Sequence, residues 1–191
     1  MWHKWGRMVQ PRPKPRPIDG PRLEELALSY AARFATSRAK LEAYLRRKLR
    51  ERGWAGEGEP PVAAIAGRMV AAGYVDDAAY ARAKSGSLLR RGYGARRVGE
   101  ALDAAGIGAE VRNEVRPGEG TARRAALTLA RKRRFGPFGA GEPDRALREK
   151  QIAAMLRAGH PLDSARELVD ARSVEAAEDW AAQAREDDAC E

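Results

Sequence analysis

One short pattern recurs three times in this 191-residue chain: Leu49-x3-Gly53-Trp54, Leu102-x3-Gly106-Ile107 and Met155-x3-Gly159-His160. The copies begin at residues 49, 102 and 155, so the spacing is 53 residues each time. A glycine after a run of helix-forming residues favours the left-handed conformation that ends a helix. The next residue then folds back on the residue five positions earlier. The recurrence therefore predicts three copies of one helical unit.

Two further glycines are placed in the same way as helix stops. Gly73-Tyr74 follows Met69, and Gly92-Tyr93 follows Leu88. Short helices that bury little apolar surface alone must stack on their neighbours. We therefore predict an all-α fold, an elongated tandem array of three three-helix repeats that resemble helix-turn-helix units, with nine helices in total.

The predicted boundaries divide the chain into five segments. The first segment alternates four prolines with Arg and Lys, which prevents helix formation and predicts a disordered or polyproline-II basic arm. The last segment is acidic, and its Trp180 either anchors a short terminal helix or is exposed. The segments are the arm at 1–20, the repeats at 21–75, 76–117 and 118–172, and the acidic tail at 173–191.

Helix starts are marked by residues that cap the first turn. Thr36 or Ser37 is placed to cap the second helix, and Asp76 is placed to cap the fourth. Ser164 with Glu167 has the spacing of a capping box and predicts the start of the ninth helix.

The net charge of +9 is concentrated in the body of the chain, because residues 173–191 hold seven acids against Arg185. A basic body favours a polyanion or an acidic protein face as partner, although a solvated helical surface explains the same charge. Cys190 is the only cysteine, which suits a reducing compartment. With neither an apolar run long enough to span a membrane nor a secretory signal in the sequence, we expect a cytoplasmic protein with no membrane partner.

Two consecutive segments resemble one known family. The first matches a GYLDD-x-x-YA signature, with Val75 in place of leucine, and the second continues into the next glycine stop. These segments are Gly73-Tyr74-Val75-Asp76-Asp77-Ala78-Ala79-Tyr80-Ala81-Arg82 and Arg90-Arg91-Gly92-Tyr93-Gly94-Ala95-Arg96-Arg97-Val98, followed by Leu102 and Gly106-Ile107. The chain resembles the RecX family, regulators of the RecA recombinase, over residues 23 to 172.

The resemblance implies a non-enzymatic protein that binds in the helical groove of the RecA filament and restrains strand exchange and ATP hydrolysis. It also implies contact with the single-stranded DNA inside the filament, with weak binding to free DNA as a further expectation. We expect a monomer that uses no cofactor. The alternative is an autonomous nucleic-acid-binding protein, because three-helix units resemble helix-turn-helix modules.

The candidate RecA- or DNA-binding face consists of basic residues from all three repeats. Its members are Arg46, Arg47, Arg50, Arg90, Arg91, Arg96, Arg97, Arg131 and Lys132. Arg96 and Arg97 begin a helix whose free backbone N–H groups would donate hydrogen bonds to a phosphate or carboxylate. A solvated basic surface and a plain turn between helices are the competing interpretations.

The residues of the family-like signature are expected to be largely structural. They are Gly73, Tyr74, Asp76, Asp77, Tyr80, Arg82, Gly92 and Gly106. Asp76 and Asp77 diverge at a helix start with no histidine or third carboxylate nearby, so capping is preferred over metal or acid–base chemistry. His3, His160 and Cys190 lack the spacing of metal ligands, and we predict neither a metal site nor a catalytic site.

Overall fold

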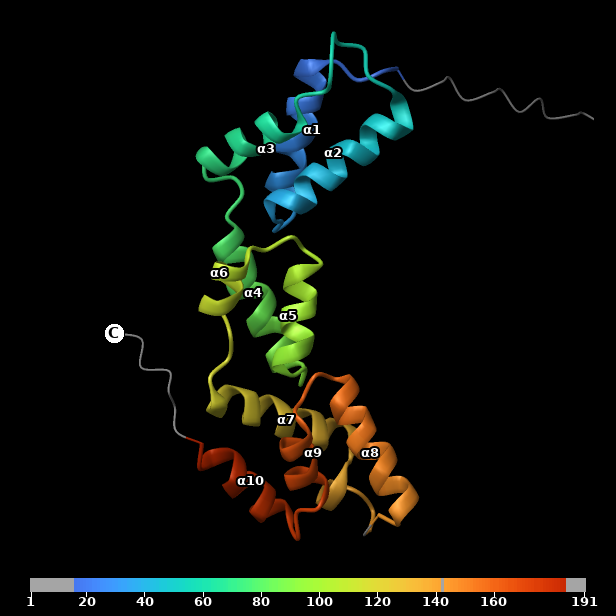
Figure 1. Cartoon of the computed structure of the whole chain (residues 1–191), viewed down its shortest axis with the longest axis vertical. Coiled ribbons are helices and arrows are strands. Elements are labelled where there is room, and N and C mark those ends of the chain that lie inside the picture. The colour runs from blue at the N-terminus through green and yellow to red at the C-terminus, as the bar shows by residue number, and fades with distance from the viewer. Residues whose placement is uncertain (1–15, 142, 185–191) are drawn as a thin grey trace, which may run out of the picture. The chain divides into compact units, whose positions relative to one another are not determined.

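The structure, a computed structural model, describes residues 16–141 and 143–184. This part of the chain contains ten α-helices, one 3₁₀-helix and no β-sheet (Figure 1). The prediction of an all-α fold is confirmed. None of the described helices combines the length and the apolar character that crossing a membrane requires. The described residues pack as two compact units, residues 16–34 with 41–74 and residues 35–40 with 75–184.

The first unit contains α1 (Gly20–Arg33), most of α2 (Arg38–Arg52) and α3 (Val62–Ala71). Asp19 caps α1 by accepting a hydrogen bond from the Arg22 N–H at 2.9 Å. The core of the first unit is built from apolar side chains of the three helices and of the segment before them. These are Ile18, Leu23, Ala27, Leu41, Leu45, Val62, Ile65 and Ala66.

Ile18 corrects the predicted extent of the N-terminal arm. Its side chain is fully buried, its N–H donates to the Gly53 carbonyl at 2.9 Å, and its carbonyl accepts from Ala55 at 2.9 Å. These two bonds form an isolated parallel bridge between Ile18 and Trp54. Residues 16–19 therefore belong to the folded unit, and residues 1–15 lie outside the described part of the chain.

The second unit begins with residues 35–40 and resumes at Val75. Its helices are α4 (Asp77–Arg90), α5 (Ala95–Asp103), α6 (Ala109–Glu114), α7 (Glu119–Arg133), the 3₁₀-helix η1 (Gly136–Phe138), α8 (Arg145–Arg157), α9 (Leu162–Val169) and α10 (Val174–Ala182). One apolar cluster is formed mainly by α4 and α5, and a second mainly by α7, α8 and α9. Ala125 and Ala126, adjacent on α7, belong one to each cluster, so α7 joins the two.

The glycine helix stops have the predicted conformation. Gly53, Gly73, Gly92, Gly106 and Gly159 all have positive φ values, between 70° and 96°. At four of them the residue after glycine donates its N–H to the carbonyl five residues earlier, the bond that defines a Schellman motif. These bonds are Tyr74 to Met69 at 2.9 Å, Tyr93 to Leu88 at 3.1 Å, Ile107 to Leu102 at 3.1 Å and His160 to Met155 at 3.2 Å.

The copy at Gly53 ends its helix differently. Its own N–H donates to the Leu49 carbonyl at 2.7 Å, the single bond of the simpler left-handed cap. Gly53 also supplies its carbonyl to Ile18. The first copy therefore combines a helix stop with attachment of the N-terminal segment.

The last third of the chain differs from the prediction in its helix ends and in the number of helices. Helix α7 ends at Arg133, and Arg134 in the left-handed conformation (φ 56°) makes the stop. The capping box predicted at Ser164 is wrong, because helix α9 begins at Leu162 after Pro161 and Ser164 lies inside the helix. Residues 174–182 form a tenth helix in the described part of the chain, where nine were predicted.

Helix α10 packs on α7, as Figure 1 shows for the C-terminal end of the described chain. Ala177 and Ala181 are buried, and the Arg123 guanidinium lies over the Trp180 ring at 4.7 Å. Of the two sequence-based alternatives for Trp180, the structure shows the anchoring of a short terminal helix.

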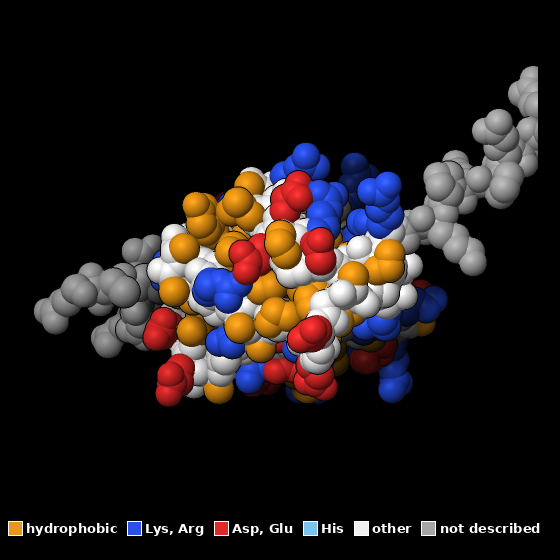
Figure 2. All heavy atoms as spheres, turned by 90° about the horizontal axis from the view of Figure 1, so that it is seen from above, with side chains coloured by type: hydrophobic (Ala, Val, Ile, Leu, Met, Phe, Trp, Pro, Cys, Tyr) orange, Lys and Arg blue, Asp and Glu red, His pale blue; other side chains and the backbone are white. Residues whose placement is uncertain are grey.

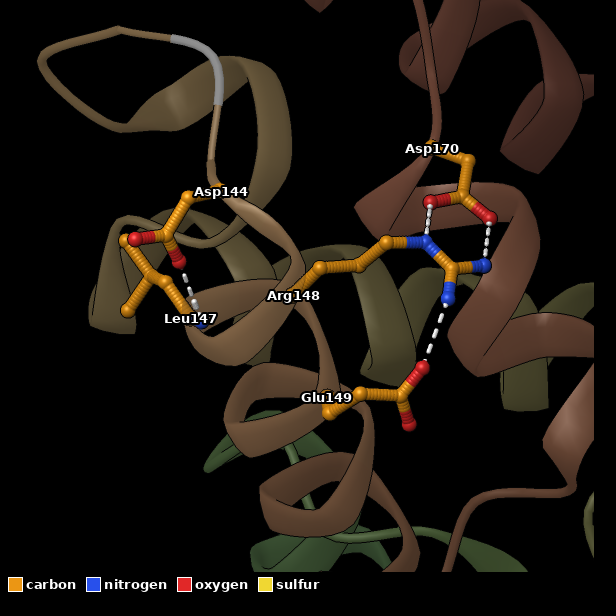
Figure 3. A network of polar contacts seen from close by, with 5 residues as sticks. All are labelled: Asp144, Leu147, Arg148, Glu149 and Asp170. Carbon is orange, nitrogen blue, oxygen red and sulfur yellow. Dashed lines mark hydrogen bonds and ion pairs between the residues drawn. The ribbon is translucent and has the colours of Figure 1, made fainter.

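An arginine joins α8 to the end of α9 (Figure 3). The Arg148 guanidinium donates two hydrogen bonds of 2.5 Å to the Asp170 carboxylate and a third of 3.0 Å to Glu149. The hydrogen bonds to Asp170 are the main cause that raises the pKa of Arg148. Asp144 caps α8 by accepting from the Leu147 N–H at 2.7 Å. Helices α8 and α9 are thus held together by polar contacts as well as by the apolar cluster that they share.

Candidate partner-binding surface

The predicted binding residues lie at exposed positions on four helices and the turn after one of them. Arg46, Arg47 and Arg50 are on α2, Arg90 and Arg91 end α4, Arg96 and Arg97 begin α5, and Arg131 and Lys132 are in the last turn of α7. In the face drawn in Figure 2, Lys and Arg side chains alternate with Asp and Glu and with hydrophobic side chains. Positive side chains on this face therefore have negative ones near them.

On α2 the arginines form ion pairs along the helix. Arg46 contacts Glu42 at 2.8 Å, and Arg47 contacts Glu51 at 3.7 Å. The pKa of Glu51 is lowered, first by its hydrogen bond from Lys48 and then, against the effect of burial, by the charges of Lys48, Arg47 and Arg50. Glu51 therefore pairs with two of the cations in the second half of α2.

The turn between α4 and α5 corrects the predicted phosphate cradle. The N–H of Gly94 donates to the Ala158 carbonyl at 2.9 Å, and the N–H of Arg96 points to the Gly159 carbonyl at 3.3 Å. These amides at the start of α5 are occupied by the carbonyls that end α8. The prediction of free backbone donors is therefore wrong for Gly94 and Arg96.

Arg96 has a structural role at the same junction. Its Nη2 donates to the Leu156 carbonyl at 2.7 Å, and its Nη1 forms an ion pair with Glu100. A guanidinium next to the carbonyl end of a helix interacts favourably with the helix dipole. Arg97 forms an ion pair with Glu100 at 3.2 Å and keeps an exposed guanidinium.

His160 completes this junction from the α8 side. Its ring is buried, and its Nε2 donates to the Gly92 carbonyl at 2.9 Å. Burial lowers the pKa of His160, while the hydrogen bond to Gly92 acts in the opposite direction. The histidine is therefore a neutral structural residue that connects the two glycine stops.

The basic residues of α7 differ in their availability. Arg131 forms an ion pair with Glu178 of α10 and lies 5.8 Å from the centre of the Phe138 ring. Lys132 is exposed. Helix α10 thus holds one of the two predicted contact residues of this helix.

The two aspartates of the signature cap two different helices. Asp76 accepts from the Ala79 N–H at 2.8 Å and caps α4. Asp77 accepts from the Arg38 N–H at 2.8 Å at the start of α2. Tyr80 is buried, and its hydroxyl accepts from Lys40 Nζ at 3.1 Å. The structure thus gives the signature a packing role, while the capping of a distant helix by Asp77 could not be predicted from sequence.

The remaining signature residues are three glycine stops, of which only Gly92 is buried, and two exposed side chains. A side chain at Gly92 would meet the Leu129 backbone at 2.9 Å, and one at Gly106 would meet the Ala39 methyl group at 2.3 Å. Gly73 has no such neighbour within 4 Å. Tyr74 and Arg82 are exposed, and Tyr74 exposes 55% of its surface.

Sequence reasoning missed an open groove between α5 and α6. Its volume is about 680 Å³. Val98, Gly99 and Leu102 line it from α5, and Arg112 and Asn113 line it from α6. Gly99 faces open space there, because nothing lies within 4 Å of the position that a side chain would occupy. No group of three or more His, Cys, Asp or Glu in the described residues is placed to hold a metal ion.

Comparisons with known proteins point to one family. No family model matches the chain. The regulatory protein RecX of Myxococcus xanthus is 32% identical over 169 residues, which cover 82% of this chain and 89% of the relative. The regulatory protein RecX of Thermus thermophilus is 43% identical over 91 residues, 48% of this chain and 61% of the relative.

The fold agrees with these relatives. The crystal structure of RecX from Lactobacillus salivarius matches with a TM-score of 0.60 at 16% identity, over 78% of this chain and 94% of that chain. At this identity the match shows a shared fold, while the Myxococcus relative carries the family assignment through its identity and coverage. The chain therefore belongs to the RecX family of regulatory proteins.

Proposed function

We propose that this protein binds in the helical groove of the RecA filament and restrains strand exchange and ATP hydrolysis. Membership of the RecX family makes it a regulatory protein and a RecA modulator rather than an enzyme. The observation that supports groove binding is the recurrence of exposed basic residues on α2, α4, α5 and α7, while the glycine stops Gly92 and Gly159 are used in packing. A partner that presents its sites repeatedly gains avidity from such an arrangement.

The contacts proposed for the filament are the exposed members of the predicted face. Each of the three predicted repeats contributes one such residue, namely Arg47 on α2, Arg97 on α5 and Lys132 on α7. All three side chains are exposed. Arg96 is assigned to packing because its guanidinium caps the end of α8. The proposed ligands are an acidic RecA surface and the single-stranded DNA that the filament encloses.

Arg97→Glu is expected to raise the protein concentration that half-inhibits RecA ATP hydrolysis by about threefold to tenfold, because it reverses one exposed charge contact. Arg166→Glu is the matched control, since Arg166 is also exposed in the second unit but lies outside the proposed face. Both variants should keep the wild-type melting temperature. Equal inhibition by the two variants would contradict a role for Arg97.

Autonomous nucleic-acid binding remains the second candidate, favoured by the net charge of +9. The acidic C-terminal residues should temper such binding. Removing residues 185–191 deletes four acids and one arginine and raises the net charge from +9 to +12, while α10 is kept. We expect tighter binding of single-stranded DNA at low salt, with a gain that shrinks towards physiological salt.

The comparison that isolates α10 is removal of residues 173–191. This deletion should also lower the melting temperature, because it uncovers the surface that Ala177 and Ala181 bury on α7. Fluorescence anisotropy across a salt titration measures the affinity. If the chain lacking residues 185–191 binds DNA like the full chain at every salt concentration, the acidic end has no such effect.

A further inference from the structure

Helix α10 is an acidic helix that lies on a basic one. Its nine residues include Glu175, Glu178 and Asp179 and contain no Lys or Arg. Helix α7 carries five Lys and Arg against one acid, Glu119. The two helices pack on each other, so a segment of net negative charge covers part of a segment of net positive charge.

The contacts of α10 engage two arginines of α7. Arg123 donates from Nη1 to the Trp180 carbonyl at 2.9 Å, and its guanidinium lies over the Trp180 ring. Arg131 forms an ion pair with Glu178. The side chain of Arg123, which also pairs with Glu119, is 23% exposed, whereas that of Arg131 is 50% exposed. Both cations are thus engaged by α10, and Arg123 is the more deeply covered of the two.

The contacts that hold α10 on α7 are individually small. The side chains that α10 buries are those of Ala177 and Ala181, which are among the smallest apolar groups available to a helix. The ion pair between Arg131 and Glu178 is exposed to solvent, where such pairs contribute little. A helix of nine residues is marginal in water without its packing partner. An element held in this way opens at a low cost in free energy.

We propose that α10 is a displaceable cover of α7, which withholds Arg123 and Arg131 from a partner and so limits the inhibition of RecA. When α10 lifts, both guanidinium groups become available on the helix that also carries Lys132, one of the contacts proposed for the filament. An acidic surface of RecA competes with α10 for the same two cations. Because that surface binds them only when α10 is lifted, its binding shifts the population towards the open form.

This inference rests on the proposed function and deepens it, because it adds two cations to the filament contacts and a contact within the chain that limits their use. The effect expected of residues 185–191 is a different one, since it concerns nucleic acid and leaves α10 in place. The test therefore needs one readout that does not involve RecA. Labelling of arginine side chains by phenylglyoxal, located by peptide mass spectrometry, reports how often Arg123 and Arg131 are uncovered.

Glu178→Gln in the full-length chain is expected to speed the labelling of Arg131 by about 1.5-fold to fivefold, the effect of losing a surface ion pair. The protein concentration that half-inhibits RecA ATP hydrolysis should fall by a similar factor. Asp179→Asn is the matched control, since it removes the same charge from the next residue of α10. Asp179 is exposed and forms no ion pair with the described residues. Its variant should behave like the wild type in both readouts.

Trp180→Ala tests the other contact. Loss of the ring under the guanidinium is expected to speed the labelling of Arg123 by about fivefold to thirtyfold, the effect of losing a desolvated cation–π contact. Trp180→Phe keeps an aromatic face and should have a smaller effect. Arg47, exposed in the first unit, is the internal reference, because its labelling should be the same in every variant.

Three results would overturn the inference. One is labelling of Arg123 and Arg131 that is unchanged by Glu178→Gln and Trp180→Ala. Another is an Asp179→Asn variant that matches Glu178→Gln in both readouts. The third is faster labelling with unchanged inhibition, measured with a wild type that does inhibit RecA, because the cover would then limit nothing. If the wild type and all variants leave RecA ATP hydrolysis constant, the proposed function fails. Faster labelling would in that case retain α10 as a displaceable cover and exclude only RecA as its partner.

Discussion

Gly94→Ala is expected to lower the free energy of unfolding by about 1–3 kcal/mol, the usual cost of overpacking a close contact. A side chain at Gly94 would lie 2.3 Å from the Gly159 carbonyl oxygen and 2.6 Å from the His160 nitrogen. Both neighbours are backbone atoms at the end of α8, so they cannot rotate away. The same displacement would strain the hydrogen bond that the Gly94 N–H donates to the Ala158 carbonyl.

Gly108→Ala is the control for this substitution. Both glycines are N-cap residues in extended conformations, with φ and ψ of −82° and 170° at Gly94 and −60° and 156° at Gly108. The added methyl group at Gly108 meets nothing within 4 Å. Chemical denaturation of both variants measures the difference. Equal unfolding midpoints would mean that α5 and α8 do not meet end to end in this way.

Gly106→Val is expected to destabilise the protein by more than backbone strain alone. The positive φ of 70° is unfavourable for a β-branched residue and costs about 1–3 kcal/mol. The new side chain would also overlap the Ala39 methyl group, 2.3 Å from its Cβ position. Residues 35–40 would have to move away from the end of α5, with loss of the 2.6 Å bond from the Ser37 hydroxyl to the Ala105 carbonyl.

Gly73→Val separates the two costs. Gly73 has a nearly equal φ of 74° but no neighbour within 4 Å. Its variant should therefore show the strain without the overlap, and its melting temperature should lie between those of the wild type and Gly106→Val. A Gly106→Val melting temperature equal to that of the wild type would exclude the left-handed stop at Gly106.

The all-α fold class and most of the helix ends were readable from sequence, because they depend on local chemistry. Each Schellman bond joins residues five positions apart, and Asp76 caps its own helix, so spacing alone identifies them. Ser37 likewise caps α2, accepting from the Lys40 N–H at 3.3 Å. Arg134 was missed because a left-handed arginine has no sequence signal comparable to glycine.

The availability of the predicted binding residues was not readable, because it depends on contacts between distant segments. Arg96 bonds to a carbonyl 60 residues away, and Arg131 pairs with a glutamate 47 residues away. Asp77 caps a helix that begins 39 residues earlier. Sequence spacing identified the charged residues, but only the packing of helix ends shows which charges are already used.

The most direct test of the central claim is titration of the full-length protein into RecA filaments preformed on single-stranded DNA, with ATP hydrolysis as the readout. We expect hydrolysis to fall as the protein is added. Arg97→Glu should shift the inhibition curve to higher protein concentration, and Arg166→Glu should not. Hydrolysis that stays constant with the protein in molar excess over RecA would contradict the assignment of this chain as a RecA modulator.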